Sequence, residues 1–253
     1  MAKKDLIVSE TEEVGNYLVI QTGIERVKAL MKETVGEDGL SPFDLDRAQN
    51  PSGKSNRWEI PTIEGDPEVT SELEGVILCH KYSRSYWEGE YSGGDEPPDC
   101  SSSDGRVGEV RDGFTGNAGG TCSECAQSKW GSGANNGQSC KLTKHIFLLR
   151  SGELLPILIV LTPSSLKEAK KYFRRLLSHQ IMPYEVVTRI KLNMTKSKSG
   201  FDHATAELSL VSRLDASTAE QMEQYSEFVR PWLDATTSIG SDVVGDSNGP
   251  EPF

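Results

Sequence analysis

Four of the chain's five cysteines lie in one glycine-rich stretch between Pro97 and Cys140. Cys122 and Cys125 form a CxxC pair, a spacing that places two thiolates on one tetrahedral ion, and Cys100 and Cys140 bracket the pair. The stretch has no helix or strand periodicity, and loops of this length are uncommon inside a compact domain unless something closes them. The spacing therefore predicts a structural Zn²⁺ site with Cys100, Cys122, Cys125 and Cys140 as ligands.

Other arrangements of these cysteines remain open. Free thiols or disulfides are the simplest alternative, although disulfides favour exported proteins and the N-terminus carries no apolar signal segment. Catalytic zinc usually keeps three protein ligands and an open position, which fits four cysteines less well. Cys79 or His80 could replace one ligand, but both lie in the apolar run 75–82 and are expected to be strand residues.

Basic and aromatic residues are interleaved just before the cysteines, over residues 80–91 (HKYSRSYWEGEY). Single-stranded nucleic acid is bound by a basic groove together with aromatic rings on which bases stack. Some of these side chains must face the core, because alternate residues of a strand point to opposite sides. The nucleic-acid contacts that we expect are Lys81, Tyr82, Arg84, Tyr86, Trp87 and Tyr91 here, with Arg189, Lys191, Lys196 and Lys198 as candidates for phosphate contact further along.

The charge distribution favours such a surface even though the chain as a whole is acidic, with a net charge of −11. Lysines and arginines are concentrated between residues 141 and 213, and the excess of acidic residues lies towards the two ends. This asymmetry is typical of a basic binding surface with acidic flanks.

The expected elements follow from periodicity and from cap residues. Helical spacing predicts a helix over residues 24–35, ended by Gly36, and another over 218–233. Alternation and apolar runs predict strands over 75–91, 145–150, 154–162, 185–195 and 203–214. Ser165 to Glu168 has the pattern of a capping box and opens a basic helix that Pro183 ends, with an apolar stripe of Leu166, Ala169, Phe173, Leu176 and Leu177.

The part before residue 75 is expected to be less regular. Pro42, Pro51, Gly53 and Pro61 indicate extended chain and turns, and residues 64–74 are interpreted as an acidic linker. We expect four apolar side chains to pin this part to the core, namely Phe43, Leu45, Trp58 and Ile60.

Three strands, a helix and two strands is the order of an OB-fold, a five-stranded and partly open barrel. The sequence therefore predicts a mainly β protein with flanking helices, of the α+β class. The zinc loop, residues 97–140, would connect the first two strands, and such loops of this fold bind oligonucleotides and oligosaccharides. We expect an N-terminal segment (1–74), an OB-fold domain (75–233) and a disordered acidic tail (234–253).

The longest apolar run, residues 154–161, contains a proline and is too short to span a bilayer. The expectation is a soluble, cytoplasmic protein with reduced cysteines and no membrane partner.

A zinc loop inserted into an OB-fold resembles the phage-encoded single-stranded DNA-binding proteins of the T4 type, over roughly residues 75–214. That resemblance implies a protein that coats and protects single-stranded DNA during replication and recombination in a bacterial host. The chain departs from the family pattern in two ways. It offers four cysteines in place of a histidine and three cysteines, and it lacks a basic N-terminal arm.

The C-terminus carries a second resemblance. Glu251, Pro252 and Phe253 end an acidic segment, as in bacterial single-stranded DNA-binding proteins, whose tails close on Pro-Phe. This similarity implies that the tail docks onto replication and recombination proteins.

Two other classes of function stay open. The sequence contains no HExxH, P-loop, nucleophile-elbow or deaminase zinc pattern, so we do not expect an enzyme, and a nucleic-acid-processing activity is the less favoured alternative. The nearer alternative is a zinc-containing protein-interaction adaptor of a phage or plasmid. Salt-dependent binding to oligonucleotides would separate the DNA-binding function from the adaptor.

Overall fold

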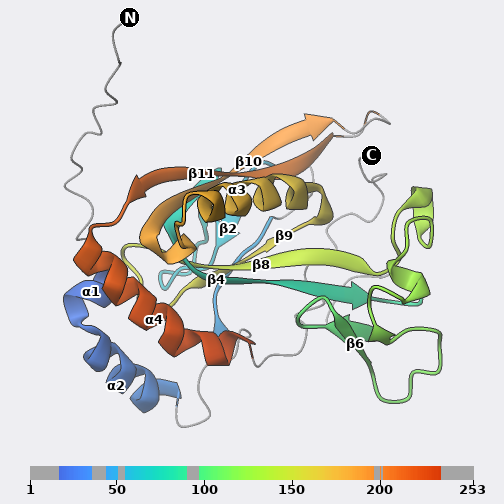
Figure 1. The fold of residues 1–253 in the computed structure, drawn as a ribbon, viewed down its shortest axis with the longest axis horizontal. Coiled ribbons are helices and arrows are strands. Elements are labelled where there is room, and N and C mark those ends of the chain that lie inside the picture. The colour runs from blue at the N-terminus through green and yellow to red at the C-terminus, as the bar shows by residue number, and fades with distance from the viewer. Residues whose placement is uncertain are drawn as a thin grey trace, which may run out of the picture.

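The computed structural model describes residues 17–35, 44–50, 55–89, 97–196, 200 and 202–234. They form an α+β protein in which a sheet dominates and helices lie against it (Figure 1). The helices are α1 (Leu18–Thr22), α2 (Ile24–Val35), α3 (Leu166–Ser178) and α4 (Ala216–Asp234). The strands are β1 (Arg47–Ala48), β2 (Trp58–Ile60), β3 (Glu68–Thr70), β4 (Glu72–Tyr86), β5 (Cys100–Ser102), β6 (Val107–Val110), β7 (Gly120–Thr121), β8 (Lys141–Leu149), β9 (Ile157–Leu161), β10 (Val186–Lys196) and β11 (Asp202–Arg213).

The long strand β4 lies at the centre of the sheet. It pairs antiparallel with β8 on one side and with β10 on the other, β8 continues to β9, and β10 continues to β11. No strand pairing joins β9 to β11 in the described part of the chain, so the strands do not close into a barrel. Helix α3 contacts β11, and the Ser165 hydroxyl just before it accepts a hydrogen bond from the Ala206 amide of that strand (2.9 Å).

Two features let β4 bend and change the side to which its residues point. A Cβ at Gly75 would clash with the carbonyl oxygen of Leu149, so only glycine allows the two strands to approach there. The pairing with β8 then shifts register between Ile77 and Cys79, which is a β-bulge. After this bulge His80 and Tyr82 lie on the side of Ile77, and Lys81 lies on the other side.

The sheet is covered on both sides by separate hydrophobic cores. One core joins the strands to α3 and includes Ile77, Ile146 and Ile190. The other joins the opposite side to α1, α2 and α4 and includes Leu78 and Phe147. Burial of each such side chain stabilises the fold by about 1.5–3 kcal/mol, which explains why β8 ends in the apolar run Ile146–Leu149.

The helices lie where the sequence pattern predicts them, but one cap and one apolar stripe differ from the prediction. α2 has the predicted bounds, and α4 exceeds its predicted range slightly because Asp215 caps it, accepting hydrogen bonds from the Ser217 and Thr218 amides at 3.0 Å. The capping box at Ser165 was a wrong prediction, since the Ser165 side chain makes no cap bond and binds Ala206 instead. Leu177 is also not part of the apolar stripe, because it is 72% exposed while Tyr172 is buried.

The segment interpreted as an acidic linker is structured. β3 pairs with β2, and β4 already begins at Glu72. Trp58, Ile60 and Leu45 are buried as expected, while Phe43 lies outside the described residues. The chain before residue 75 therefore contributes to the same cores as the strands that follow. None of the helices in the described ranges is long and apolar enough to cross a membrane.

Candidate functional site

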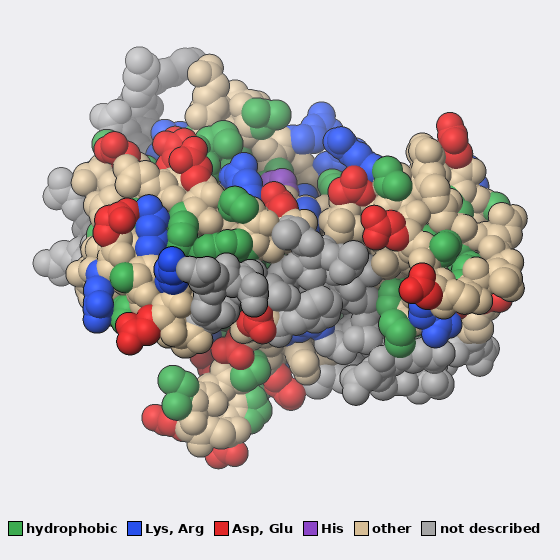
Figure 2. Space-filling view, turned by 90° about the horizontal axis from the view of Figure 1, so that it is seen from below, with side chains coloured by type: hydrophobic (Ala, Val, Ile, Leu, Met, Phe, Trp, Pro, Cys, Tyr) green, Lys and Arg blue, Asp and Glu red, His purple; other side chains and the backbone are tan. Residues whose placement is uncertain are grey.

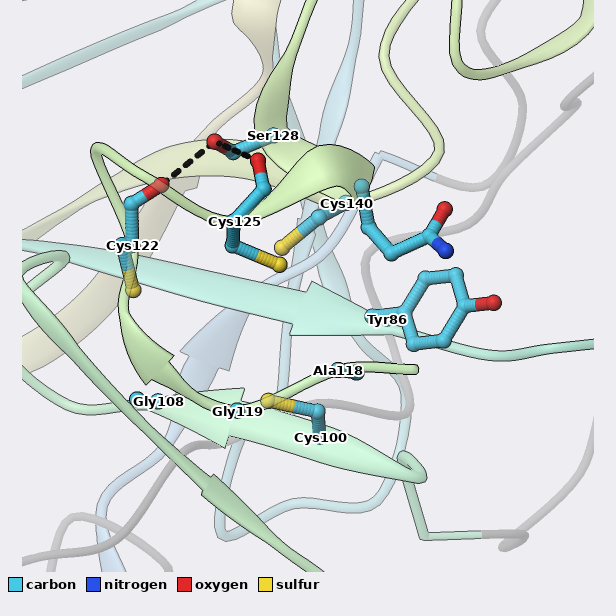
Figure 3. A pocket seen from close by; sticks show the side chains of 11 residues that line it. Tyr86, Cys100, Gly108, Ala118, Gly119, Cys122, Cys125, Ser128 and Cys140 are labelled. Carbon is cyan, nitrogen blue, oxygen red and sulfur yellow. Dashed lines mark hydrogen bonds between the residues drawn. The ribbon is translucent and has the colours of Figure 1, made fainter. Parts of the chain in front are cut away.

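The four cysteines of the predicted zinc site line one small cavity, together with Tyr86 and the backbone of several glycines (Figure 3). They come from separate places in the chain: Cys100 starts β5, Cys122 follows β7, Cys125 precedes a short 3-10 turn, and Cys140 directly precedes β8. The fifth cysteine, Cys79, is not among the residues lining this cavity. The fold therefore brings together the four cysteines that the spacing selected.

Backbone hydrogen bonds fix the chain around this cavity. The Cys122 amide donates to the Arg106 carbonyl (2.7 Å), the Cys125 amide to Thr121 (3.0 Å) and the Cys140 amide to Gln127 (2.9 Å). The Ser128 hydroxyl donates to the carbonyl oxygens of Cys122 and Cys125, as Figure 3 shows. The CxxC turn is held by these bonds and not by a hydrophobic core of its own.

Gly108 leaves space for the sulfur atom of Cys100. A Cβ at Gly108 would lie 2.9 Å from the Cys100 sulfur, so a larger residue would push into the cavity. The cavity itself has a volume of about 10 Å³, enough for about one water-sized sphere. Within the part of the chain that the structure describes, no group of three or more His, Cys, Asp or Glu side chains is arranged so that it could hold a metal ion as it stands.

Burial and nearby hydrogen-bond donors act on these thiols in opposite directions. Burial raises the pKa of Cys140 to about 11, although the Arg84 guanidinium beside it works the other way. Burial also raises the pKa of Cys100, while a hydrogen bond from the Gly119 backbone opposes that rise. Donors to sulfur favour the thiolate form, which is the form that ligates metals.

A second group of side chains lies on β4, β8 and α3. Lys144 of β8 stands opposite Tyr82 of β4, and its Nζ is 4.1 Å from the centre of the Tyr82 ring and 4.7 Å from that of Phe173. The Phe173 ring in turn packs on His80, with ring centres 4.0 Å apart. We call Lys144, Tyr82, Phe173 and His80 the aromatic-lysine cluster.

Lys144 is buried without an ion partner. Only 3% of the residue is exposed, and its side chain makes no hydrogen bond or salt bridge with the residues that the structure describes. Burial lowers its pKa to about 8, and burial together with the Lys144 charge lowers the pKa of His80 to about 4. A buried cation needs compensation, and within the described part of the chain the faces of two aromatic rings supply it.

Arg84 connects this cluster to the cysteines. It follows Tyr82 on the same side of β4, and its Nη1 donates to the Cys140 carbonyl oxygen (3.3 Å). Its Nε is buried and has no hydrogen-bond partner within the described ranges. The site thus runs without interruption from the aromatic-lysine cluster to the rim of the cysteine cavity.

The remaining residues expected to contact nucleic acid on β4 lie elsewhere. Lys81 is on the opposite side of the strand, where its Nζ donates to the Leu233 carbonyl oxygen at the end of α4 (2.5 Å). Tyr86 is only 5% exposed and packs edge-on against Phe114, so its ring belongs to the wall of the cysteine cavity. Trp87 is half-buried just after β4, and Tyr91 lies outside the described residues.

The candidates on β10 point away from this group. Arg189 forms a salt bridge with Glu74, and the Lys191 amine is 3.8 Å from a Glu72 carboxylate oxygen. Both bases are next to Ile190 in the strand and point to the other side of the sheet. Ile190 packs in the core with α3, so Arg189 and Lys191 point away from α3. Lys196 is exposed at the end of β10, and Lys198 lies outside the described residues.

Sequence reasoning named Tyr82 and Arg84 but missed Lys144, His80 and Phe173 as partners. The signal available was a lysine, followed by His145, directly before the apolar run 146–149. Its pairing with Tyr82 depends on the bulge at Cys79, which the sequence pattern does not reveal. Exposed bases of α3, among them Lys170 and Arg174, extend the positive charge beyond Phe173. Figure 2 shows lysine and arginine side chains gathered beside a histidine along one edge of the molecule.

The tail residues Glu251, Pro252 and Phe253 lie outside the described residues. Comparison with known proteins adds no assignment: no family model, no curated protein and no solved structure matches this chain.

Proposed function

We propose that this protein binds single-stranded DNA through the side of the sheet that carries the aromatic-lysine cluster. The observation that carries the proposal is Lys144, a buried lysine whose ammonium group lies over two aromatic rings and, among the residues that the structure describes, has no carboxylate partner. A phosphate group would supply the missing negative charge, and the exposed part of the Tyr82 ring would supply a surface for a base. This is the combination by which proteins bind single strands without reading their sequence.

The strand order supports an OB-fold as the framework. β4, β8, β9, β10 and β11 follow one another in the order of the five OB strands, with α3 between the third and the fourth. Their pairing, with β4 between β8 and β10, is compatible with an OB sheet that stays open between β9 and β11. The cysteine loop then connects the first two strands, and loops of this fold contribute to oligonucleotide binding.

The proposal includes one structural Zn²⁺ ion held by Cys100, Cys122, Cys125 and Cys140. The support is that all four thiols line one cavity, that Gly108 leaves room for Cys100, and that N–H donors approach two of the sulfurs. A bound zinc ion would fix the loop against Arg84 and hence against the DNA site. Reduced thiols at this site agree with a cytoplasmic protein, and all five cysteines are free in the structure.

The wider role follows the two resemblances found in the sequence. The protein would coat and protect single-stranded DNA in replication and recombination, in a phage-infected bacterial cell. Its tail, ending in Glu251, Pro252 and Phe253, would recruit replication and recombination proteins.

Replacement of Tyr82 by alanine tests the proposed surface. Stacking of a base on an aromatic ring contributes about 1–3 kcal/mol, so Tyr82→Ala should weaken binding to single-stranded DNA by that amount in a fluorescence-anisotropy titration. Tyr184→Ala is the matched control, since Tyr184 bonds to Glu223 near α4 and should leave affinity unchanged. Equal affinity of the Tyr82 and Tyr184 variants, with both folded, would remove Tyr82 from the site.

A further inference from the structure

β2 and β3 form a hairpin whose turn is exposed at every residue from 61 to 68. Ile63 in this turn is 106% exposed, so its side chain contributes nothing to either core. Glu64 and Asp66 are close to it in the turn, and neither forms a salt bridge within the described ranges. The turn therefore presents an apolar side chain together with two carboxylates to the solvent.

The hairpin is held in place at its base. Trp58 and Ile60 of β2 are 3% and 2% exposed and lie in the core that includes α3. Glu68, at the start of β3, forms a salt bridge with Arg150 (2.7 Å). Because these contacts already fix the hairpin, a partner that binds its turn would lose little free energy in ordering it.

The charge of this part of the chain favours a basic partner. Residues 58–80 contain six acidic residues and no lysine or arginine. Two of the six, Glu72 and Glu74, face bases of β10, whereas the two carboxylates of the turn have no such partner in the described part of the chain. An apolar centre with a charged rim is the usual arrangement of a protein–protein contact.

The outer face of α3 has the opposite charge. Its exposed bases that form no salt bridge with the described residues are Lys167, Lys170, Arg174 and Arg175. Leu177 is 72% exposed and lies three residues after Arg174, a spacing that makes the two side chains neighbours on the helix surface. The helix therefore combines an exposed apolar side chain with bases, as the hairpin combines Ile63 with acids.

Both surfaces belong to one chain, so every copy of the protein carries both. A chain with a net charge of −11 repels its own copies in most orientations. Contact between the acidic hairpin and the basic helix is an orientation in which the local charges attract, and like-charge contacts disfavour the others. A contact between two different surfaces leaves one of each free in a dimer, so it can repeat along a row of copies.

We propose that the β2–β3 hairpin of one copy docks on the outer face of α3 of a second copy. Ile63 packs against Leu177 in this contact, and the carboxylates of Glu64 and Asp66 lie among the α3 bases. The inference is independent of the proposed DNA binding. Because the α3 bases lie beside the proposed DNA surface, the contact is measured without DNA, and failure of one proposal does not decide the other.

Sedimentation velocity of the full-length protein over a concentration series, at low and at high salt, measures the contact. Wild type should self-associate, and more strongly at low salt, because exposed charges are then screened less. The hairpin variant, Glu64→Lys with Asp66→Lys, and the helix variant, Lys170→Glu with Arg174→Glu, should each associate at least about tenfold more weakly, since like charges then face each other. An equal mixture of the two variants should associate again, because a basic hairpin then meets an acidic helix.

Two further variants separate local contact from general charge. Glu220→Lys with Glu227→Lys changes the net charge by the same amount as the hairpin variant, on exposed positions of α4, and should associate no more weakly than wild type. Ile63→Ser removes the apolar part of the contact alone. It should weaken association and leave the melting temperature unchanged, because the side chain is fully exposed.

Wild type that stays monomeric at every concentration and at both salt concentrations would overturn the proposal and leave the hairpin to a basic partner of another kind. Reversed variants that associate like wild type would overturn it as well. So would a mixture of the two variants that stays monomeric, since the contact would then not join these two surfaces.

Discussion

Lys144 is the residue whose surroundings most constrain what the site can bind. It lies between Tyr82 and Phe173, with His80 next to Phe173, and no carboxylate in the described ranges pairs with it. Such a lysine destabilises the folded protein by itself, because burial disfavours the charged form. An anionic ligand that binds Lys144 would explain why a charged residue occupies this buried position.

The pKa of Lys144 gives a pH prediction. Because this pKa is about 8, affinity for single-stranded DNA should fall as the pH rises from 7 to 9, and Lys144→Met should show a flatter pH profile. The variant should also bind roughly tenfold or more weakly at pH 7, since hydrogen bonds to charged groups contribute about 1.5–3 kcal/mol. Anisotropy titrations at several pH values measure both effects.

The stability of the folded protein should rise with pH, whereas its affinity for single-stranded DNA should fall. The folded pKa of about 8 is below the ordinary value of 10.5, so the unfolded chain binds more protons between these pH values and stability rises with pH across that window. Lys144→Met should lack this rise and be more stable at pH 7, by about 1–3 kcal/mol. Lys81→Met, on the other side of β4, is the control for affinity. A Lys144→Met protein that is less stable and binds normally would contradict this account of the residue.

At the scale of elements, the cysteine loop is positioned by β4 and β8, which extend beyond the two cores to reach it (Figure 1). Its own hydrophobic cluster is small, consisting of Tyr86, Cys100 and Cys140 with Phe114 and Ala118 packed against them. This cluster buries little apolar surface, so hydrogen bonds hold most of the loop, and the proposed metal ion would add to its stability.

Cys122→Ser tests the zinc proposal. The variant should lose bound zinc and melt roughly 5 °C or more below wild type, because each kcal/mol of stability corresponds to about 2–4 °C in a domain of this size. Cys79→Ser should keep its zinc, since Cys79 does not line the cavity. Elemental analysis and thermal melts provide the readouts. Wild-type protein purified without chelator and containing no zinc would end the proposal.

The elements were largely predictable because their signals are local. Residues 24–35 carry a complete helical pattern, and the strands around 145–150 and 185–195 have clear apolar runs or alternation. The grouping of side chains was less predictable, because it depends on register. The bulge at Ile77 and Cys79 decides that Tyr82 faces Lys144 while Lys81 faces α4, and bulges leave no pattern in a single sequence.

Other wrong predictions have a similar physical cause, namely a partner that only the fold brings near. Ser165 begins a capping-box sequence, yet its hydroxyl accepts a hydrogen bond from the Ala206 amide and caps no helix. Arg189 and Lys191 look like phosphate ligands, yet Glu74 and Glu72 on the neighbouring strand pair with them. In each case a partner that is distant in sequence competes with the local one, and only the fold brings it near. The four cysteines selected by their spacing do line one cavity, and their role as zinc ligands stays a prediction.

At the scale of the whole molecule, the two sides of the sheet are unlike. α1, α2 and α4 cover one side completely enough to bury Leu78 and Phe147, while α3 leaves the end of the other side near Tyr82 partly open. The open end lies between the bases of α3 and Arg84, which bonds to the cysteine loop at Cys140. The net charge of −11 over the whole chain disfavours general binding of duplex DNA and other polyanions, so the proposed recognition depends on this one surface.

The most direct measurement of the central claim is a fluorescence-anisotropy titration of the full-length protein with single-stranded DNA and with the matching duplex, each at two salt concentrations. The account predicts clear preference for the single strand, since only unstacked bases can reach Tyr82, and a steep loss of affinity with salt because phosphate contacts release counterions. Equal binding of duplex and single strand, or no salt-dependent binding of either, would contradict it.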